Sequence, residues 1–468
     1  MAETEFGKQL QAIETTIPGL TLWELPVHGD SRGWFKENWQ REKMTALGLA
    51  DFGPVQNNVS FNDAVGTTRG IHAEPWDKWV SVATGRIFGA WVDLREGPTF
   101  GAVFTAEIDP SRAIFVPRGV GNSYQTLEPD TAYTYLVNDH WSPDASYSFL
   151  NLADETAAVD WPIPLTDVEI SAKDLAHPRL ADVVPIPAKK TLVVGAGGQL
   201  GLALRAAYAG DATVEFATRA DLDLTADLSG ARRWRDYGTI VNAAAYTAVD
   251  AAETDRAGAW AGNVSAVAQL ARIATEHGIT LVHVSSDYVF DGSATSAYRE
   301  DEPFAPLGVY GQTKAAADAT VSTVPRHYIV RTSWVIGEGK NFVRTMASLA
   351  ARGVDPSVVD DQVGRLTFTD DIARGIRHLT SSGAPYGTYN LTGAGEPASW
   401  ADIAAEVFEL TGSDRARVTG VSTEAYFASA AAPVSPRPRW SVLDLAKIEA
   451  TGFTPRDWRE SLREYLAE

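Results

Sequence analysis

The chain has 468 residues, of which 45% are hydrophobic and 21% charged, and its net charge is −20. A chain of this length is expected to hold two or three domains, each with its own core. The acidic balance disfavours binding to nucleic acid or to anionic membranes, because both need basic protein surface. The sequence has no cysteine and no apolar run near the roughly 18 residues that span a bilayer. We therefore expect a cytoplasmic protein that binds neither nucleic acid nor membranes.

The first 186 residues have the pattern of an all-β domain. Short runs rich in Val, Ile, Phe, Tyr and Thr recur, and turns with Gly, Pro, Asn and Asp separate them, at 79–83, 86–93, 103–108, 113–116 and 132–137. This rhythm is typical of a sandwich or a barrel. The sequence Pro-Ile-Pro-Ala-Lys-Lys at 185–190 is typical of a short stiff linker. We therefore expect one domain over residues 1–186 and a second over residues 187–468.

From residue 191 onward, strand patterns alternate with helical patterns. Strands are expected at 191–194, 239–242 and 280–284, and helices at 200–208 and 257–277. This alternation is typical of βαβ units on a parallel sheet. The second half is therefore predicted to be a Rossmann-type, doubly wound α/β domain.

A glycine-rich segment follows the first strand of that domain. Gly195, Gly198 and Gly201 lie in the sequence Gly-Ala-Gly-Gly-Gln-Leu-Gly, just before the first helix. Glycine lets the backbone turn tightly and approach a pyrophosphate at a helix N-terminus, where N–H groups favour anions. A plain tight turn is the alternative. The position between a strand and a helix favours a dinucleotide site.

A tyrosine and a lysine lie four residues apart at Tyr310 and Lys314, on one face of a predicted helix. A neighbouring ammonium favours the phenolate, so the tyrosine can exchange a proton with a substrate oxygen. Ser286 ends an apolar strand, at the edge of the sheet where ligands of parallel sheets bind. The alternatives are an ordinary exposed pair and a polar strand end that caps the next loop.

The cofactor preference depends on the end of the second strand. No acidic residue stands there for a ribose 2′-hydroxyl, and Arg219 is placed to meet a 2′-phosphate. A solvated surface arginine is the alternative. We expect NADPH, with NADH left open.

Three motifs of the second half, at 242–250, 285–292 and 310–314, resemble dTDP-4-dehydrorhamnose reductases, which are extended short-chain dehydrogenases. The resemblance continues at 331–334, 361–364 and 437–441, whereas Arg-Leu-Thr at 365–367 departs from the usual small residue–Pro–Thr. It implies a small substrate-binding lobe and hydride transfer to C4 of a nucleotide-bound 4-keto-6-deoxyhexose, with Tyr310 as the proton donor. The implied site residues are Ser286, Tyr310 and Lys314 for catalysis, Gly195, Gly198, Gln199, Leu200, Gly201, Arg219, Ala243 and Ala244 with Tyr310 and Lys314 for the cofactor, and Trp334 and Arg437 for the substrate.

The first half has only four histidines, His28, His72, His140 and His177, and no His-x-His pair, so no metal site is expected. Its segments at 30–37, 55–60, 68–72, 133–135 and 171–174 resemble dTDP-4-dehydrorhamnose 3,5-epimerases. This resemblance implies a cupin-like jelly-roll barrel and a homodimer through this domain. The implied catalytic residues are the base His72, its partner Asp174, the acid Tyr135 and the enolate stabiliser Lys78, and the implied substrate-binding residues are Arg32, Glu37, Gln56, Asn58 and Arg69.

Together the two resemblances predict a fusion of two consecutive enzymes of dTDP-L-rhamnose synthesis. The first half departs from its family at two places. Asn122 stands where members usually have a histidine, and the stretch 73–77 between His72 and Lys78 is shorter than usual. Two alternatives therefore remain open for this half. It epimerises a single carbon of another 4-ketosugar nucleotide, or it is a non-catalytic dimerisation module.

Overall fold

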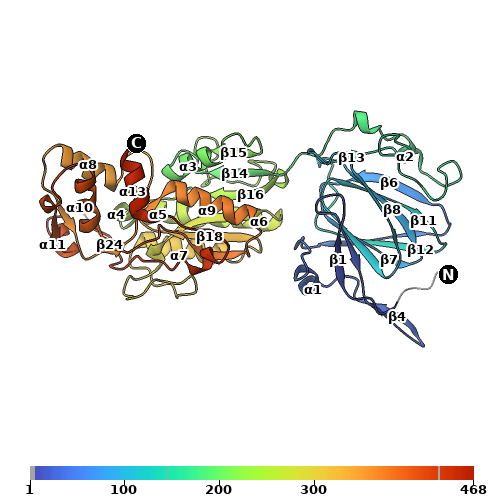
Figure 1. Cartoon of the computed structure of the whole chain (residues 1–468), viewed down its shortest axis with the longest axis horizontal. Coiled ribbons are helices and arrows are strands. Elements are labelled where there is room, and N and C mark those ends of the chain that lie inside the picture. The colour runs from blue at the N-terminus through green and yellow to red at the C-terminus, as the bar shows by residue number, and fades with distance from the viewer. Residues whose placement is uncertain (1–5, 144, 431–432, 468) are drawn as a thin grey trace. The chain divides into compact units, whose positions relative to one another are not determined.

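The computed structural model describes residues 6–143, 145–430 and 433–467. The chain divides into two compact units, Met1–Ala188 and Lys189–Glu468 (Figure 1). Each unit buries its own hydrophobic clusters. Among the described residues, no helix is both long and apolar enough to cross a membrane.

The first unit contains two antiparallel sheets, which confirms the predicted all-β class. The first sheet has the order β1 (Gln11–Glu14), β2 (Thr21–Glu24), β10 (Arg112–Val116), β7 (Lys78–Thr84), β12 (Thr131–Val137) and β5 (Gln56–Asn62). The second has the order β13 (Ser148–Phe149), β6 (Thr68–Ala73), β11 (Val120–Thr126), β8 (Ile87–Asp93) and β9 (Val103–Ile108). A separate hairpin joins β3 (Val27–Asp30) to β4 (Gly33–Lys36), and the helices are α1 (Arg41–Thr45), α2 (Ala172–Leu175) and η1 (Leu180–Asp182).

Apolar side chains of both sheets form one core. Val80 of β7 and Ile114 of β10 belong to the same buried cluster as Trp91 of β8 and Ile108 of β9. Alternate residues of a strand point to opposite faces of a sheet, so each sheet contributes its inward residues to this layer. This apolar core fixes the positions of the strands on either side of it.

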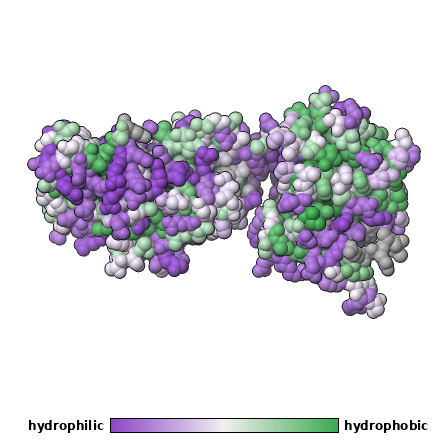
Figure 2. Space-filling model, in the orientation of Figure 1, coloured by the Kyte–Doolittle hydropathy of each residue, from purple (hydrophilic) through white to green (hydrophobic). Residues whose placement is uncertain are grey.

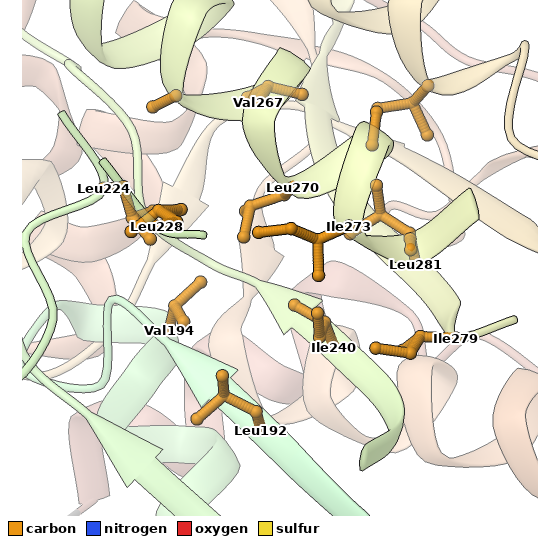
Figure 3. Close-up of a cluster of buried hydrophobic side chains, with 14 of the residues drawn as sticks. Leu192, Val194, Leu224, Leu228, Ile240, Val267, Leu270, Ile273, Ile279 and Leu281 are labelled. Carbon is orange, nitrogen blue, oxygen red and sulfur yellow. The ribbon is translucent and has the colours of Figure 1, made fainter. Parts of the chain in front are cut away.

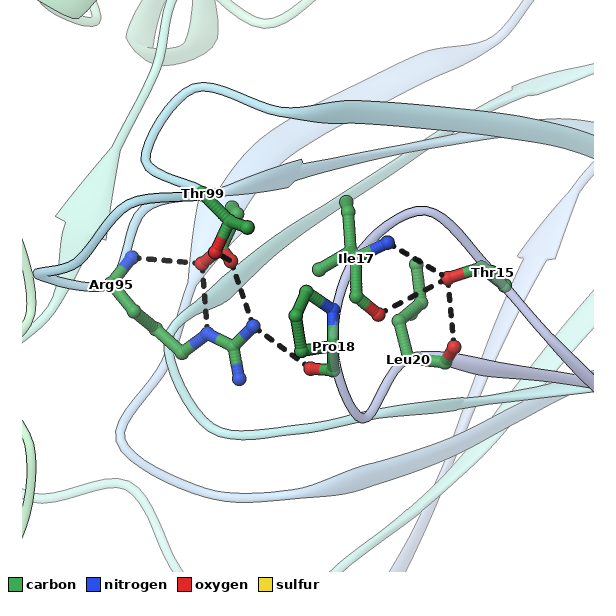
Figure 4. Close-up of polar contacts among 7 residues, drawn as sticks. Thr15, Ile17, Pro18, Leu20, Arg95 and Thr99 are labelled. Atoms are coloured by element: carbon green, nitrogen blue, oxygen red, sulfur yellow. Dashed lines mark hydrogen bonds and ion pairs between the residues drawn. The ribbon is translucent and has the colours of Figure 1, made fainter.

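A buried carboxylate ties the end of β8 to the turn before β2 (Figure 4). Asp93 accepts hydrogen bonds from Arg95 Nε at 2.8 Å and Nη2 at 2.7 Å, and from the Thr99 hydroxyl at 2.8 Å. Arg95 Nη2 also donates to the Pro18 carbonyl at 2.9 Å. Burial alone would raise the pKa of Asp93, but these hydrogen bonds outweigh it and hold the pKa below its usual value. The charge is therefore paired, as a buried carboxylate requires.

The second unit is built on a six-stranded parallel sheet, which confirms the predicted α/β class. Its order is β15 (Val214–Ala217), β14 (Lys190–Val194), β16 (Tyr237–Asn242), β17 (Thr280–Ser286), β18 (His327–Thr332) and β23 (Gly387–Asn390). The chain runs outward from β14 to β15 and then returns to β16 on the other side. Such a reversal leaves a crevice at the carboxyl ends of β14 and β16, where doubly wound sheets bind ligands.

Helices cover both faces of this sheet. On one face Leu192, Ile240 and Leu281 lie under α6 (Ala266–Glu276) and α7 (Val309–Val321), and Figure 3 shows Leu270 and Ile273 of α6 against them. The next residue of each strand, such as Val193, faces α3 (Gln199–Ala207) and α9 (Thr369–Ser381). A strand buried on both sides needs this unbroken apolar run.

The helix predicted at 257–277 is confirmed as a continuous helical run, and it contains a π-helical turn that the sequence did not predict. The structure has α5 (Arg256–Trp260), a π-helical turn at Ala261–Ser265 and then α6. Within the turn, Asn263 is buried, accepts from the Tyr246 N–H at 2.7 Å and donates to the Thr313 hydroxyl at 2.9 Å. The turn therefore aims a polar side chain at the first half of α7.

A smaller lobe completes the second unit around its own buried cluster. It contains α8 (Phe342–Ala351), α10 (Trp400–Leu410) and α13 (Trp458–Ala467). Short strand pairs accompany them, namely β19 (Val335–Ile336) with β22 (Thr367–Phe368), β20 (Ser357–Val359) with β25 (Thr419–Val421), and β21 (Val363–Gly364) with β24 (Ala398–Ser399). The remaining elements are α4 (Val249–Ala252), α11 (Thr423–Phe427), α12 (Ala446–Glu449) and 3₁₀ turns at Trp234–Asp236, Asp287–Val289 and Arg415–Arg417.

Candidate active sites

The second unit has a cavity of about 850 Å³ at the carboxyl ends of β14, β16 and β17. It brings together most of the residues that the sequence predicts for this half. The predicted residues that line it are Gly195, Gly198, Gln199, Leu200, Arg219, Ala243, Ala244, Ser286, Tyr310, Lys314 and Trp334. Gly201 and Arg437 do not line it.

The glycine-rich segment fits its predicted role through close backbone contact. Gly195 has φ +77°, and a Cβ there would lie 2.5 Å from the Ala244 nitrogen. A Cβ on Gly201 would lie 2.4 Å from the Gly195 carbonyl oxygen. Gly198 is the N-cap of α3, and no side chain caps that helix. The N–H groups of the first turn therefore lie at the cavity wall, where they favour an anion such as a pyrophosphate.

Ser286 and Tyr310 meet on one side of this cavity. Ser286, at the end of β17, is 8% exposed and donates to the Asp287 carboxylate at 3.0 Å. Burial raises the pKa of Tyr310 to about 12, Asp287 adds to the rise, and a hydrogen bond with Ser286 opposes it. Burial also raises the pKa of Asp287, to about 6. The Tyr310 phenol therefore keeps its proton at neutral pH, as an acid must before it acts.

Lys314 is buried below Tyr310, and its Nζ donates to the Val284 carbonyl at 2.7 Å. Burial lowers its pKa to about 8, against the opposing charge of Asp318 one helical turn away. The amino group is thus charged at neutral pH and titrates just above it.

A buried histidine that the sequence did not single out lies next to Lys314. His283 Nε2 is 3.4 Å from Lys314 Nζ, and burial together with that lysine holds the pKa of His283 well below its usual value. Asn242 Oδ1 accepts from the Ala244 N–H, so its Nδ2 faces His283 Nδ1 at 3.1 Å. Because Nδ1 then accepts, the ring proton sits on Nε2 and points at Nζ. An N–H of His283 that points at Lys314 Nζ disfavours the charged form of the lysine, in agreement with the lowered pKa of Lys314.

Two predicted substrate residues have different surroundings. Trp334 lies at the cavity wall and stacks on Trp400, with ring centroids 3.8 Å apart. Arg437 Nη2 is ion-paired with Asp250 at 2.8 Å, and the guanidinium also hydrogen-bonds Tyr288, which itself lines the cavity. Arg437 thus contacts a residue of the cavity wall without lining the cavity itself.

The first unit has a smaller, polar cavity of about 160 Å³ between its sheets. It brings together four of the predicted residues, namely His72, Lys78, Tyr135 and Arg69. The other residues that line it are Ser60, Gly70, Glu74, Asn122, Tyr124 and Tyr133. Asn122 holds the site of the absent family histidine and is fixed by hydrogen bonds from Trp91 Nε1 at 2.9 Å and to the Tyr133 hydroxyl at 3.0 Å.

His72 and Asp174 form the predicted pair. His72 Nε2 lies 2.9 Å from Asp174 Oδ1, and the carboxylate is 5% exposed. The Gly70 N–H approaches the second carboxylate oxygen at 3.4 Å. Because a carboxylate only accepts, Nε2 carries the ring proton and Nδ1 keeps a free lone pair. This is the arrangement of a histidine prepared to take up a proton.

Tyr135 and Lys78 lie on strands β12 and β7, which pair with each other. Burial raises the pKa of Tyr135 above its usual value, and Glu74 and Tyr124 add to the rise. Lys78 Nζ forms an ion pair with Glu74 and lies 5.7 Å from the centre of the Tyr135 ring. Glu74, which the sequence did not single out, therefore anchors the cation.

The remaining predicted substrate residues lie outside the lining of this cavity. Arg32 is paired with Asp30 in the β3–β4 hairpin, and Glu37 with Lys43 at 2.6 Å. Gln56 donates to Asn58 on β5 at 2.7 Å. Asn58 is the partner of Tyr135 in the sheet register, so it lies beside a residue that lines the cavity.

His177 is the other residue that the sequence did not assign to the site. It follows α2 and lies with His72 and Asp174 in a group whose ligand atoms are all within 4.8 Å of one another. The spacing Asp174-x-x-His177 is the only sequence signal for it.

Comparison with known proteins gives a match for each unit. Residues 189–468 match the family described as RmlD substrate binding domain, and residues 14–182 match the family described as dTDP-4-dehydrorhamnose 3,5-epimerase. A protein named RmlC homolog, from Streptococcus pyogenes serotype M6, is 49% identical over 197 residues, which are 40% of this chain and 99% of that protein.

The second unit has relatives of known sequence and structure. A dTDP-4-dehydrorhamnose reductase of Aggregatibacter actinomycetemcomitans is 36% identical over 292 residues, 59% of this chain and 98% of that protein. The crystal structure of a dTDP-4-dehydrorhamnose reductase from Bacillus anthracis in complex with NADP is 30% identical and covers 60% of this chain and 99% of that one, with a TM-score of 0.54.

Proposed function

Because the chain belongs to the RmlD family over residues 189–468 and to the dTDP-4-dehydrorhamnose 3,5-epimerase family over residues 14–182, we propose that it catalyses two consecutive steps of dTDP-L-rhamnose biosynthesis. The first unit epimerises dTDP-4-dehydro-6-deoxy-D-glucose at C3 and C5. The second unit reduces the C4 ketone of the product with NADPH. Both steps act on the same ketone, which first acidifies its neighbouring C–H bonds and then accepts hydride.

Epimerisation requires a proton to leave one face of the sugar and to return to the other. We assign the removal to His72 Nδ1, whose lone pair is free because Nε2–H is bonded to Asp174. Tyr135 lines the same cavity, keeps its phenolic proton because of burial, and returns a proton to the carbon from the opposite face.

The intermediate of this step carries negative charge on the C4 oxygen. The Lys78 ammonium, held by its ion pair with Glu74, is the cation nearest to Tyr135 and stabilises that enolate. Arg69 lies at the exposed side of the cavity, where a nucleotide diphosphate needs a positive charge. The site thus supplies a base, an acid and a charge for the oxygen between them.

In the second unit NADPH supplies the hydride to C4. Tyr310 donates its phenolic proton to the oxygen on C4 as the alkoxide develops, and Ser286 hydrogen-bonds the same oxygen. The phenolate that remains is stabilised by the Lys314 ammonium one helical turn away. The Ser286 hydroxyl donates to Asp287 at 3.0 Å, so it turns from that carboxylate to donate to the C4 oxygen, which can only accept.

The cofactor fits the residues that line the larger cavity. A Cβ at Gly195 would collide with the backbone of Ala243 and Ala244, so glycine lets the loop and this second segment of the cavity wall lie in close contact. Arg219 is exposed at the same cavity and pairs only loosely with Asp223, at 3.7 Å. It is therefore free to turn toward a 2′-phosphate, which supports NADPH over NADH.

The observation that carries the proposal is that one chain holds both sets of residues. The His72–Asp174 pair lies beside Tyr135 in the first unit. Ser286, Tyr310 and Lys314 line one cavity of the second unit. The test of the proposal is to incubate the purified full chain with dTDP-4-dehydro-6-deoxy-D-glucose and to identify the product by NMR. With NADPH we expect dTDP-L-rhamnose. A sugar reduced at C4 that keeps the substrate's configuration at C3 or C5 would refute the epimerase assignment. An unchanged ketone would refute the reductase assignment.

We further propose a cytoplasmic homodimer that joins through the first unit, whose two sheets form a cupin-like jelly roll. β5 is an edge strand, and its side chains Val59 and Phe61 are 67% and 56% exposed. Hydrophobic side chains also reach the surface of this unit in Figure 2. Phe61→Asp is expected to convert the dimer to a monomer in sedimentation velocity, and a monomeric parent chain would contradict the proposal.

A further inference from the structure

Three side chains in the first unit form a group that the proposed reaction uses only in part. His72 lies on β6, Asp174 lies in α2, and His177 follows α2. Asp174 Oδ1 is 2.9 Å from His72 Nε2 and 3.7 Å from His177 Nε2. One carboxylate oxygen therefore lies between two imidazoles, of which proton transfer needs only one.

His177 is buried, with 9% of its surface exposed, and neither ring nitrogen has a hydrogen bond of ordinary length and angle. The Leu150 carbonyl lies beside the ring. Phe149 stacks on the imidazole with ring centroids 4.8 Å apart, so the ring is held against the other two side chains. A buried imidazole whose nitrogens lack a hydrogen bond of ordinary geometry requires an explanation, because its desolvation is costly.

These distances and groups match a metal site. Two imidazoles and a carboxylate are preferred zinc ligands, and in a tetrahedral site with bonds of about 2.1 Å the ligand atoms lie about 3.4 Å apart. The distances from Asp174 Oδ1 to the two imidazole nitrogens, 2.9 and 3.7 Å, lie on either side of that value. The Leu150 carbonyl beside His177 is the kind of outer partner that orients a metal-bound histidine.

We propose that His72, Asp174 and His177 bind a divalent transition metal, with Zn²⁺ the best fit, and that the bound ion switches off the epimerase. The reason is the ring proton of His72. A neutral imidazole holds one proton, so a metal on Nε2 leaves that proton on Nδ1, the atom that must accept a proton from the sugar. The ion also takes Asp174 away from the ring. Metal binding itself does not depend on the proposed function, whereas the inhibition does.

Metal binding is tested on the full chain with Co²⁺ alone as a probe. A visible absorption band of four- or five-coordinate Co²⁺ that Zn²⁺ removes at one equivalent is the expected result. This measurement requires no variant and no substrate. A spectrum of octahedral, water-bound Co²⁺ would overturn the proposed site, whether or not the chain is an epimerase.

Inhibition is tested by deuterium exchange at C3 and C5 in ²H₂O without NADPH, at buffered concentrations of Zn²⁺. His177→Phe keeps an aromatic ring against Phe149 and removes the ligand, and each variant is normalised to its own metal-free rate. We expect Zn²⁺ to stop exchange in the parent chain, and the inhibition constant to rise at least about 100-fold in His177→Phe, more than the loss of an outer partner gives.

His140→Gln is the matched control, because His140 is an exposed histidine of the same unit that contacts Gln56. It is expected to retain the parent's sensitivity to Zn²⁺. Reduction of a pre-epimerised substrate by the second unit is expected to continue at the same Zn²⁺ concentration. Equal inhibition of His177→Phe and the parent, or faster exchange with Zn²⁺, would overturn the proposal.

Discussion

The two cavities both place a tyrosine with a raised pKa near a lysine, but they treat the lysine differently. In the first unit Lys78 is ion-paired with Glu74. In the second, Lys314 contacts the Val284 carbonyl and the neutral His283, and burial lowers its pKa to about 8. An enolate oxygen is stabilised by a positive charge beside it. A phenolate that forms and is reprotonated in each turnover can be stabilised by an ammonium group whose pKa is close to neutral pH. The ion pair with Glu74 therefore distinguishes the surroundings of Lys78 from those of Lys314, which is the adjustable cation.

The sharpest way to separate the two sites is to remove the base of the first. His72→Asn is expected to lower deuterium exchange at C3 and C5 about 10⁴-fold, at the upper end of the range for general bases, because the structure shows one imidazole lone pair at the cavity. Reduction of a pre-epimerised substrate is expected to stay at the parent rate. NMR of the exchange reaction measures the first and NADPH absorbance the second. Undiminished exchange would show that another group is the base.

The complementary change removes the acid of the second site. Tyr310→Phe is expected to lower the rate of reduction about 10³-fold, since Ser286 and Lys314 remain to polarise the ketone. Fluorescence titration is expected to show unchanged NADPH binding, and epimerisation is expected to continue. A variant with full reductase activity would contradict the role of this phenol.

The adjustable lysine predicts a pH dependence for reduction alone. The Lys314 ammonium, which stabilises the Tyr310 phenolate, is present below its pKa of about 8 and is lost above it. The Tyr310 phenol stays protonated because its pKa is about 12. The rate of reduction is therefore expected to be near its maximum at pH 7, to be halved near pH 8 and then to fall about tenfold for each further pH unit. A rate that rises through pH 8 would contradict this assignment.

The smallest expected effect is a loss of thermal stability in the second unit when alanine replaces a glycine of its cofactor loop. Gly195→Ala places a Cβ at φ +77° and against Ala244, whereas Gly210→Ala meets the same strain at φ +84° with nothing within 4 Å. The strain costs about 1–2 kcal/mol in each, and the contact adds to it at Gly195. Calorimetry of the full chain is expected to show one lowered transition, lowered further for Gly195→Ala than for Gly210→Ala. Equal shifts would mean that the backbone contact at Ala244 relaxes freely.

Sequence patterns predicted most of this architecture because each depends on local physics. The switch of hydrophobic period near residue 190 separated a β half from an α/β half, and the strands predicted at 103–108 and 132–137 agree with β9 and β12 within one residue. The helix predicted at 257–277 agrees with the helical run at 256–276. Its π-helical turn was not predicted, and there Asn263 bonds across to Tyr246 and Thr313, contacts that no local pattern contains.

The site residues divide in the same way. Gly195, Tyr310 and His72 stand in short motifs, so the sequence could name them. His283 stands alone, and it matters because the fold brings it to Lys314 from a distant position. His177 is three residues after Asp174, and it matters because the fold brings both of them to His72. Arg32 and Glu37 were named with the motif at 30–37, yet in one chain they pair with Asp30 and Lys43 away from the cavity lining. Long-range contacts are what a single sequence conceals.

The most direct test of the central claim is one reaction of the full chain with dTDP-4-dehydro-6-deoxy-D-glucose and unlabelled NADPH in ²H₂O. If one ketone is used for both steps, the product is dTDP-L-rhamnose with deuterium at C3 and C5 and protium at C4. A reduced sugar that carries protium at C3 and C5 would contradict the account.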